Sequence, residues 1–422
     1  MSESQSGLRG IHFFLLAIIL IFGTFLRITP HAFSPGSSFH WLAPLHPQPA
    51  WDQIGFDEGL YREYVNGLTK DGLGSYPDMV QAYIDAQSKM ATPMLPPVRF
   101  LYIFTGYIWK SIFGSETLEG LRQVAAVFSV LTLFLATAFA WRLRGPAWGC
   151  AVAALMAFAP TQIHMSQHAL IDGFFTFWTI VAIWLLWENL ILPNDWRRLV
   201  GFGVSLAILV ITKENSCFVW LAMVTLIVAN RWLKFGIATR SLLLVTVAGP
   251  LLGVVILVFL SGGLSNLIET YRLLVTKASV AHYAIMTGDG PWYRYLVDLM
   301  LVSPIVLILA IGAIFRLNRT MRPELYFVIF IAASYLIMCN VRNGMNLRYA
   351  NIWDMPLRFL AVSCLSGLVG PMARYRNLVF GAAIALIAAV EFHQYIVLAV
   401  RYPLYELITH DLLQALHILK TQ

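Results

Sequence analysis

The chain has 422 residues, of which 59% are hydrophobic and only 12% are charged, and its mean hydropathy is +0.70. Soluble domains contain about 25% charged residues, so these values exclude an ordinary soluble globular protein. The net charge of +7 does not indicate a nucleic-acid partner, because no basic run or aromatic-interleaved basic patch accompanies it. A spanning helix needs roughly 20 residues, so the composition predicts an all-α, polytopic integral membrane protein.

Apolar runs along the chain predict eleven membrane spans. They occupy residues 11–28, 121–141, 147–161, 173–190, 199–212, 216–230, 241–260, 298–315, 324–339, 350–369 and 378–398. The first run is longer than a signal-peptide core and lacks a clear small-x-small cleavage site, so we interpret it as a retained anchor. A further run, 98–113, is short and aromatic and follows Pro96-Pro97. We expect it to lie in the membrane interface rather than to cross.

Basic residues in the connecting segments predict the orientation. If 98–113 does not cross, the loops on the side of Arg9 contain Arg142, Arg144, Arg197, Arg198, Arg231, Lys234, Arg240, Arg316, Arg319, Arg322, Arg374 and Arg376. The positive-inside rule places this side in the cytoplasm. We therefore expect the N-terminus inside and the C-terminus outside. The chain is then one membrane domain, 1–422, whose first extracytoplasmic loop covers about 30–120.

The first outer loop is too long to be a simple connection, and loops of this length usually carry function. Within it, residues 56–68 predict an amphipathic helix with acidic residues in its first turn. Residues 72–77 predict a turn. The other outer segments are 162–172, 212–216, 261–297, 340–349 and the tail after 399, which we interpret as turns and loops.

Ionisable residues at membrane depth are candidates for a functional site, and the unusual ones gather on the predicted outer side. They are Asp57, Glu58, Asp172, Lys213, Glu214, His282, Tyr283, Arg342 and Arg348. His164 and His168 are expected at the surface of a short turn. The four cysteines form no CxxC pair, so they indicate neither a metal site nor a disulfide framework.

Each of the stronger candidates also has a plainer reading. Asp57 and Asp172 could each cap the N-terminus of a helix. Lys213 and Glu214 could pair with each other at the water boundary. Arg348 could extend to phosphate headgroups in the manner of a snorkelling side chain. The clustering on one side, rather than any single residue, is what indicates a site.

Several motifs resemble those of the GT-C glycosyltransferases. The nearest branch is family 39, the dolichyl-phosphate-mannose protein mannosyltransferase superfamily with its bacterial aminoarabinose-transferase relatives. The motifs are Asp57-Glu58 with Tyr61, Leu95-Pro96-Pro97 before the aromatic run ending at Phe113-Gly114, Leu170-Ile171-Asp172-Gly173, Thr212-Lys213, Gly290-Pro291-Trp292-Tyr293 and Leu347-Arg348-Tyr349. They extend over most of the chain in the family's order.

Three departures from the family pattern leave the donor sugar and the acceptor open. Met94-Leu95 stands where the aminoarabinose transferases carry charged residues, and Gln167-His168 stands in the region where an arginine is usual. The loop 261–297 is too short for the lumenal domain of the eukaryotic protein mannosyltransferases.

The resemblance implies transfer of a sugar from a polyprenyl-phosphate donor to a hydroxyl of a lipid, glycan or protein acceptor. It implies a bacterial inner-membrane enzyme whose site faces away from the cytoplasm. Asp57 is our candidate general base in an inverting reaction, with Glu58 and Asp172 orienting the acceptor or holding the loop. The candidate substrate-binding residues are Tyr61, His168, Lys213, His282, Arg348 and Tyr349. Lys213 and Arg348 are placed at the phosphate, with His282 as a weaker candidate.

Other readings stay open at this point. A divalent cation between Asp57 and Asp172 is compatible with the preference of hard cations for carboxylates, but we predict no metal site or cofactor. A secondary transporter would use charges within the spans, for which Asp354, Glu188 and Glu391 are the best case. A lipid-binding membrane protein without transferase activity predicts that the Asp57 and Asp172 carboxylates lie far apart.

Overall fold

The computed structural model describes residues 2–28, 33, 36–47, 55–280, 288–341, 345–370, 375–402, 404 and 409–417. The first half contains α1 (Ser2–Arg27), η2 (His40–Leu45), α2 (Phe56–Asp71), η3 (Leu73–Ser75), α3 (Tyr76–Lys89), α4 (Phe100–Phe113), α5 (Thr117–Arg144), α6 (Pro146–Ala157), α7 (Pro160–Ser166), α8 (Ile171–Ile191) and α9 (Trp196–Thr212). The second half contains α10 (Ser216–Leu233), α11 (Arg240–Leu260), α12 (Leu264–Ala278), α14 (Arg294–Val302), α15 (Pro304–Ile314), α16 (Arg322–Met338), η4 (Leu347–Trp353), α17 (Asp354–Val369), α18 (Arg376–Tyr395), η5 (Ile396–Arg401) and α19 (Thr409–Ala415). These elements include no strand, which confirms the predicted all-α class.

All eleven predicted spans are largely helical in the structure. Six helical segments are long and apolar enough to cross a membrane: α5, α8, α10, α11, η4 with α17, and α18 with η5. The bent pair α6 and α7 makes a seventh if it counts as one broken span. The protein is therefore an integral membrane protein, and the count of eleven stays a prediction.

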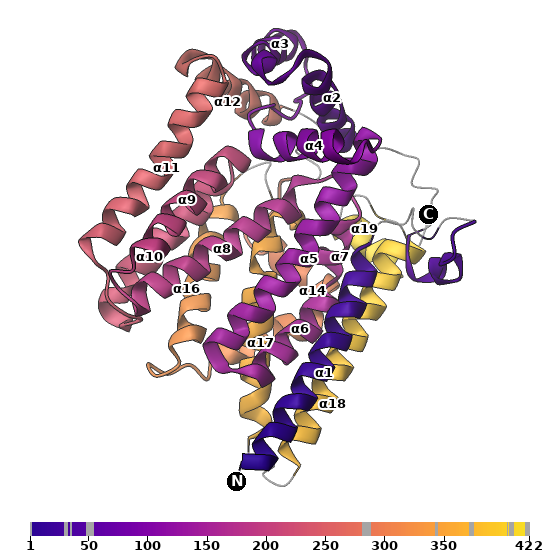
Figure 1. Cartoon of the computed structure of the whole chain (residues 1–422), viewed down its shortest axis with the longest axis vertical. Coiled ribbons are helices and arrows are strands. Elements are labelled where there is room, and N and C mark those ends of the chain that lie inside the picture. The colour runs from indigo at the N-terminus through magenta and orange to yellow at the C-terminus, as the bar shows by residue number, and fades with distance from the viewer. Residues whose placement is uncertain are drawn as a thin grey trace.

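Helices α2, α3 and α4 of the first loop gather at one end of the molecule (Figure 1). The predicted helix at 56–68 is α2, and the predicted interfacial run at 98–113 is α4, which lies across the ends of the longer helices. Helices α3 and α12 were not predicted. In α3 the buried residues Tyr76, Val80, Tyr83 and Gln87 recur at helical spacing, a pattern that a search for continuous apolar runs does not detect.

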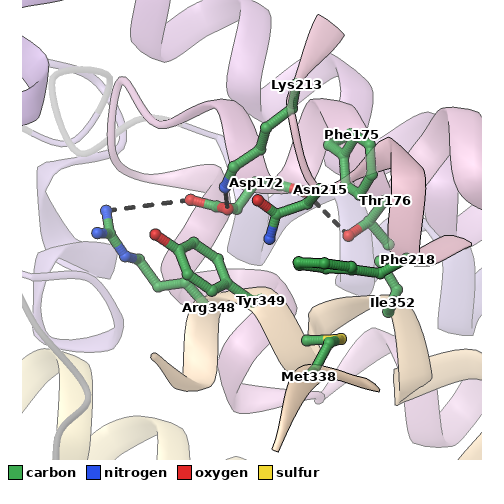
Figure 2. A pocket seen from close by; sticks show the side chains of 10 residues that line it. All are labelled: Asp172, Phe175, Thr176, Lys213, Asn215, Phe218, Met338, Arg348, Tyr349 and Ile352. Carbon is green, nitrogen blue, oxygen red and sulfur yellow. Dashed lines mark hydrogen bonds and ion pairs between the residues drawn. The ribbon is translucent and has the colours of Figure 1, made fainter. Parts of the chain in front are cut away.

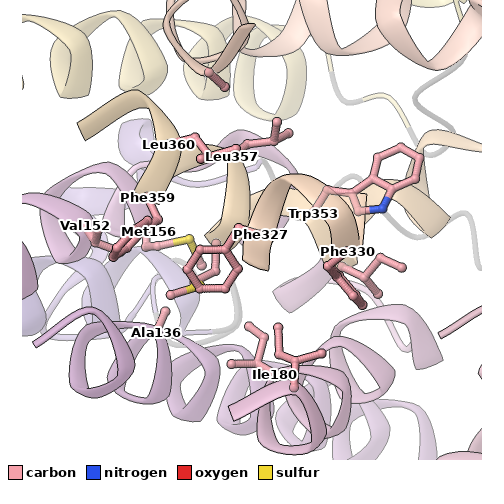
Figure 3. Packing of buried hydrophobic residues seen from close by; sticks show 14 of the residues in the cluster. Ala136, Val152, Met156, Ile180, Phe327, Phe330, Trp353, Leu357, Phe359 and Leu360 are labelled. Atoms are coloured by element: carbon pink, nitrogen blue, oxygen red, sulfur yellow. The ribbon is translucent and has the colours of Figure 1, made fainter. Parts of the chain in front are cut away.

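The main core lies among the long helices. Figure 3 shows side chains from α5, α6, α8, α16, η4 and α17 packed together, including the fully buried Phe327, Phe359 and Trp353. Burial of aromatic side chains of this size contributes most of the packing contact in such a core. The indole N–H of Trp353 donates to Ser334 Oγ at 2.7 Å, so the ring is fixed at the point where η4 passes into α17.

One predicted span, 147–161, is interrupted. Helix α6 ends at Ala157, and α7 begins at Pro160 at an angle of 61°. Proline has no N–H and clashes with the preceding turn, so the chain bends here. Helix α7 then covers 162–166, the first part of the segment 162–172 that we expected to be a short turn. His164 and His168 are consequently about 1% exposed, and their predicted surface position is wrong.

Two buried arginines satisfy the carbonyl oxygens that the bend leaves without helical partners. Arg27 from α1 donates to the carbonyls of Met156 and Ala157 at 2.7 and 3.0 Å. Arg358 from α17 donates to the carbonyl of Leu155 at 3.0 Å. The bend is thereby held from both sides, and the direction of α7 toward the start of α8 is fixed.

Candidate functional site

A narrow pocket with a volume of about 10 Å³ lies where four separate segments meet. Figure 2 shows its lining side chains, with Arg348, Asp172, Lys213 and Tyr349 on one side and the apolar groups, with the Thr176 hydroxyl among them, on the other. The lining residues are Asp172, Phe175, Thr176, Lys213, Asn215, Phe218, Met338, Arg348, Tyr349 and Ile352. Four of the residues predicted for the site therefore line one pocket: Asp172, Lys213, Arg348 and Tyr349.

Asp172 is the centre of the polar end of the pocket. It is the second residue of α8 and is 4% exposed. Its Oδ1 lies 2.5 Å from Lys213 Nζ, and its Oδ2 lies 4.0 Å from Arg348 Nη1. No side chain caps the start of α8, so the helix-capping alternative for Asp172 does not describe its position. Two cations instead compensate the buried charge of this carboxylate.

Lys213 reaches Asp172 because α9 ends at Thr212 and the chain turns sharply into α10. The Nζ of Lys213 also lies 4.1 Å from the ring centroid of Tyr349, a distance at which the aromatic face attracts a cation. Burial lowers the pKa of the Lys213 ammonium, and the neighbouring Asp172 carboxylate opposes that shift. The ammonium is thus held at the bottom of the polar end by a carboxylate and an aromatic ring.

Asp57 approaches the same arginine from the first loop. It lies in the first turn of α2, and its Oδ2 is 3.0 Å from Arg348 Nη1. The side chain of Asp57 is 20% exposed, whereas that of Arg348 is 7% exposed. Arg348 therefore does not extend to the surface as a snorkelling side chain does. Its guanidinium lies between Asp57 and Asp172, whereas the lipid-binding alternative predicted that the two carboxylates lie far apart.

The neighbouring acidic residue, Glu58, does not line the pocket. It holds the start of α2 to the rest of the protein. Its Oε1 accepts from the Ala169 N–H at 2.7 Å and lies 3.2 Å from Arg122 Nε. Its Oε2 accepts from the Gly55 N–H at 3.2 Å. Burial alone would raise the pKa of Glu58, but contacts with His168 and Arg122 hold it at about 2. Glu58 thus fastens the start of α2 to the loop before α8.

His168 belongs to this anchor rather than to the pocket lining. Its Nδ1 lies 3.8 Å from Glu58 Oε2. Burial lowers the pKa of His168, and the neighbouring Glu58 carboxylate opposes that shift. His282, Tyr283 and Arg342 lie outside the described residues.

Arg99 is a site-adjacent residue that the sequence reasoning missed. Its Nη1 donates to the hydroxyl of Tyr61 at 2.7 Å, and its Nε donates to Glu214 Oε2 at 3.1 Å. Burial alone would raise the pKa of Glu214, but Arg99 holds it below its usual range. Glu214 therefore pairs with Arg99. The plainer reading, in which Glu214 pairs with Lys213, does not describe its position. Its position directly after Val98 and the Pro96-Pro97 pair could have indicated Arg99 as a residue of the site.

The charges deeper in the bundle form a closed network away from the pocket. Arg358 donates to Asp354 Oδ1 at 2.7 Å and to Glu391 Oε2 at 2.6 Å. Gln162 Nε2 donates to Asp354 Oδ2 at 2.9 Å and also bonds Asn351. Glu188 pairs with arginines at the opposite end of α8. The three acids on which the transporter alternative depended are thus each paired with arginine, an arrangement typical of structural charges.

Within the described part of the chain, no three His, Cys, Asp or Glu side chains lie close enough together to hold a metal ion. The space between Asp57 and Asp172 is taken by the Arg348 guanidinium.

The chain resembles known proteins in both its sequence and its fold. Residues 76–272 match the family model for dolichyl-phosphate-mannose-protein mannosyltransferase. The fold is similar to that of the oligosaccharyltransferase of Archaeoglobus fulgidus in the apo form, with a TM-score of 0.59 and 14% identity over 91% of this chain and 55% of that one. It is also similar to apo ArnT from Cupriavidus metallidurans, with a TM-score of 0.56 and 13% identity over 96% of this chain and 78% of that one. The chain has the GT-C fold of membrane glycosyltransferases.

Other solved structures with the GT-C fold were determined with ligands. The Archaeoglobus fulgidus enzyme AglB in complex with an inhibitory peptide and a dolichol-phosphate gives a TM-score of 0.56 at 14% identity, covering 91% of this chain and 55% of that chain. This chain thus spans about half the length of the archaeal enzyme. A search of curated proteins by sequence finds no match. The family match includes Asp172 and Lys213 of this GT-C protein, whereas Asp57 and Arg348 lie outside it.

Proposed function

We propose that this GT-C protein transfers a sugar from a polyprenyl-phosphate donor to an acceptor hydroxyl. The observation that carries the proposal is the convergence of Asp57, Asp172, Lys213 and Arg348 at one end of the bundle. Two carboxylates and two cations meet the needs of this reaction, which must remove a proton from a weak nucleophile and stabilise a departing phosphate. The family match and the likeness to ArnT support the same class of reaction.

In the proposed reaction Asp57 is the general base. Its carboxylate accepts the proton of the acceptor hydroxyl as the oxygen attacks the anomeric carbon of the sugar. The bond from that carbon to the phosphate oxygen breaks, and polyprenyl phosphate leaves with the bonding electrons. Attack from the side opposite the leaving group inverts the anomeric configuration. General-base assistance of this kind typically contributes ~10²–10⁴-fold to the rate.

Lys213 and Arg348 stabilise the leaving phosphate in this proposal. Both are nearly fully buried, at 2% and 7% exposed, and cations in a water-poor site act more strongly on developing charge than they do in water. A guanidinium carries five N–H donors, so Arg348 can contact a phosphate oxygen while it still orients Asp57. Asp172 holds Lys213 in place.

The position of the site suits a lipid-linked donor. The isoprenoid tail stays in the bilayer, so the reacting bond lies near the headgroup level. The candidate residues stand at the ends of α8 and α9 and at the start of η4 with α17, where helices meet loops. From the positive-inside pattern we propose that this end faces away from the cytoplasm of a bacterial inner membrane. The ArnT structure bound to undecaprenyl phosphate, with a TM-score of 0.51 and 13% identity, is consistent with such a donor.

The decisive experiment uses purified protein in proteoliposomes with a panel of undecaprenyl-phosphate sugars, each labelled in the sugar. Lipid, glycan and protein fractions of a bacterial envelope serve as acceptors. We expect label to move from one donor into one acceptor fraction, with release of undecaprenyl phosphate and inversion at the anomeric carbon. Failure of every donor with folded protein contradicts the proposal.

The assignment of Asp57 is tested with Asp57→Asn, which keeps the shape of the side chain and removes the base. We expect transfer to fall by ~10²–10⁴-fold with no change in membrane insertion. Asp71→Asn is the matched control, because Asp71 is an exposed carboxylate at the other end of α2. Wild-type turnover by Asp57→Asn removes Asp57 as the base.

A further inference from the structure

A second groove lies at the opposite end of α8 from the pocket and has a volume of about 460 Å³. Asp172 and Glu188 are 16 positions apart on α8, which corresponds to ~24 Å along the helix axis. This distance is close to the roughly 30 Å thickness of a bilayer core. Helix α8 packs against both α5 and α9, and the groove runs along α5 and α8 to the point where these two helices end and α9 begins.

The charged end of the groove is organised by one buried carboxylate. Glu188 is 7% exposed, and its Oε1 accepts from Arg142 Nε at 2.9 Å and from Trp184 Nε1 at 3.2 Å. Its Oε2 accepts from Arg198 Nη1 at 2.9 Å. Two guanidinium groups from different helices are therefore fixed side by side.

These guanidinium groups retain the capacity to bind an anion. The side chains of Arg142 and Arg198 are 48% and 32% exposed. Of five N–H donors each, some are used for Glu188 and, in Arg198, for Asp195. The two acids Glu188 and Asp195 balance the charges of Arg142 and Arg198, so the excess positive charge at this end comes from the exposed neighbour Arg197. The two guanidinium groups keep N–H donors for an anion, and guanidinium groups bind phosphate well.

The rest of the groove is apolar. Leu135 on α5 and Val181 and Leu185 on α8 are partly exposed and line it. Leu135 and Val181 are each two helical turns, or ~10 Å, from the charged residues on the same helices, in the direction of the pocket end. At the charged end, Trp196 and Trp232 are 67% and 68% exposed, as is typical of aromatic residues at the headgroup level. The apolar part therefore points into the bilayer.

We propose that this groove binds one anionic phospholipid, with its phosphate at Arg142 and Arg198 and an acyl chain against Leu135, Val181 and Leu185. The apolar lining favours a lipid over a soluble phosphate, because only a lipid fills both parts of the groove. The positive-inside pattern places this end in the cytoplasmic leaflet, where basic pockets between spanning helices bind anionic headgroups. The site is about one membrane thickness from the proposed transferase site and does not depend on that activity.

The binding test uses purified full-length protein in neutral detergent, with dioleoylphosphatidylglycerol as the probe and native mass spectrometry to count bound lipids. We expect one phosphatidylglycerol to bind at least ~10-fold more tightly than dioleoylphosphatidylcholine, as the excess positive charge requires. Glycerol phosphate at the same concentrations should not compete. Equal binding of the two lipids, or competition by glycerol phosphate alone, overturns the proposal.

Variants locate the site. The double variant Arg142→Ala/Arg198→Ala should lose the tight phosphatidylglycerol, whereas Arg231→Ala/Arg240→Ala should retain it, because these two exposed arginines at the same end lie outside the groove. Val181→Trp fills the apolar part and keeps every charge, so it tests the site even if the double variant unfolds. Retention of the tight lipid by Val181→Trp overturns the proposal.

Discussion

Arg348 donates a hydrogen bond to Asp57 at 3.0 Å, although 291 positions separate them in the sequence. The pair joins the first turn of α2, in the first loop, to η4 near the end of the chain. This pairing holds two distant segments together beside the pocket. It also places a cation beside the carboxylate that we propose as the base. Substitutions at Arg348 should therefore affect both the orientation of Asp57 and the departure of the phosphate.

We expect a graded loss of sugar transfer at this position. Arg348→Lys keeps one charge but lacks the planar fork that contacts two oxygens at once, so kcat/KM should fall ~10-fold. Arg348→Met removes the charge and should reduce it by ~10²–10³-fold, the range seen when one electrostatic contact to a transition state is lost. Arg401→Met, which removes an exposed arginine at the end of η5, is the control. Equal rates for all three variants and the wild type would return Arg348 to a structural role.

Lys213 should matter more for the donor than for the acceptor. Lys213→Met removes the ammonium 2.5 Å from Asp172 and leaves that carboxylate with Arg348 at 4.0 Å as its nearest cation. We expect kcat/KM for the lipid-phosphate donor to fall ~10²–10³-fold, with a small change in KM for the acceptor. The measurement is a steady-state series in each substrate, with Lys70→Met, an exposed lysine on α2, in parallel. A selective rise in the acceptor KM contradicts this assignment.

The helices were predictable because most of them carry a continuous apolar run, which is a local property of the sequence. The elements that sequence reasoning missed have other causes. Helix α3 has a buried face within a polar segment, and α12 likewise mixes buried residues with polar ones. The break at Pro160 depends on Arg27 and Arg358, which lie on helices far away in the sequence and cannot be paired with it by local pattern.

The site was predictable to the extent that charged residues at membrane boundaries are rare. That reasoning identified Asp57, Asp172, Lys213 and Arg348, but it could not decide their partners. Lys213 and Glu214 are adjacent, yet they pair with Asp172 and Arg99. Such pairing depends on which way each side chain leaves the turn, and this is set by the packing of α4, α8 and α9.

Glu58 should contribute stability that depends on pH. Its pKa is held at about 2, below the usual 4.5, so the folded state prefers the ionised form. The contribution is therefore present above about pH 4.5 and is lost as the pH falls toward 2. Glu58→Gln should lower the free energy of unfolding at neutral pH by ~1–3 kcal/mol. It should also flatten the dependence of the unfolding temperature on pH between about 5 and 2.

The comparison for Glu58 is Glu63→Gln, which removes an exposed carboxylate from the same helix. Thermal unfolding of both variants and the wild type in detergent, measured at several pH values, gives the result. We expect Glu63→Gln to follow the wild-type curve. If Glu58→Gln follows it as well, the anchor between α2 and the loop before α8 does not stabilise the fold in the way that its hydrogen bonds indicate.

The buried pair of Arg358 and Glu391 offers a test of the network that holds the bend between α6 and α7. Both side chains are completely buried, and Arg358 also compensates Asp354. Arg358→Met leaves two acids without that cation and should cost ~3–5 kcal/mol of unfolding free energy. Glu391→Gln keeps a hydrogen-bonding group and should cost less.

The double variant Arg358→Met/Glu391→Gln should be more stable than the sum of the two single effects predicts, because it removes the uncompensated charge of Glu391. Thermal unfolding in detergent, converted to free energies for the four proteins of the cycle, measures this coupling. We expect ~1–3 kcal/mol. The bend should also loosen in Arg358→Met, because the carbonyl of Leu155 loses its donor, and faster amide exchange in α7 would show it. Additive effects with unchanged exchange would mean that the proline bend alone determines the direction of α7, and that the arginines only fill the space beside it.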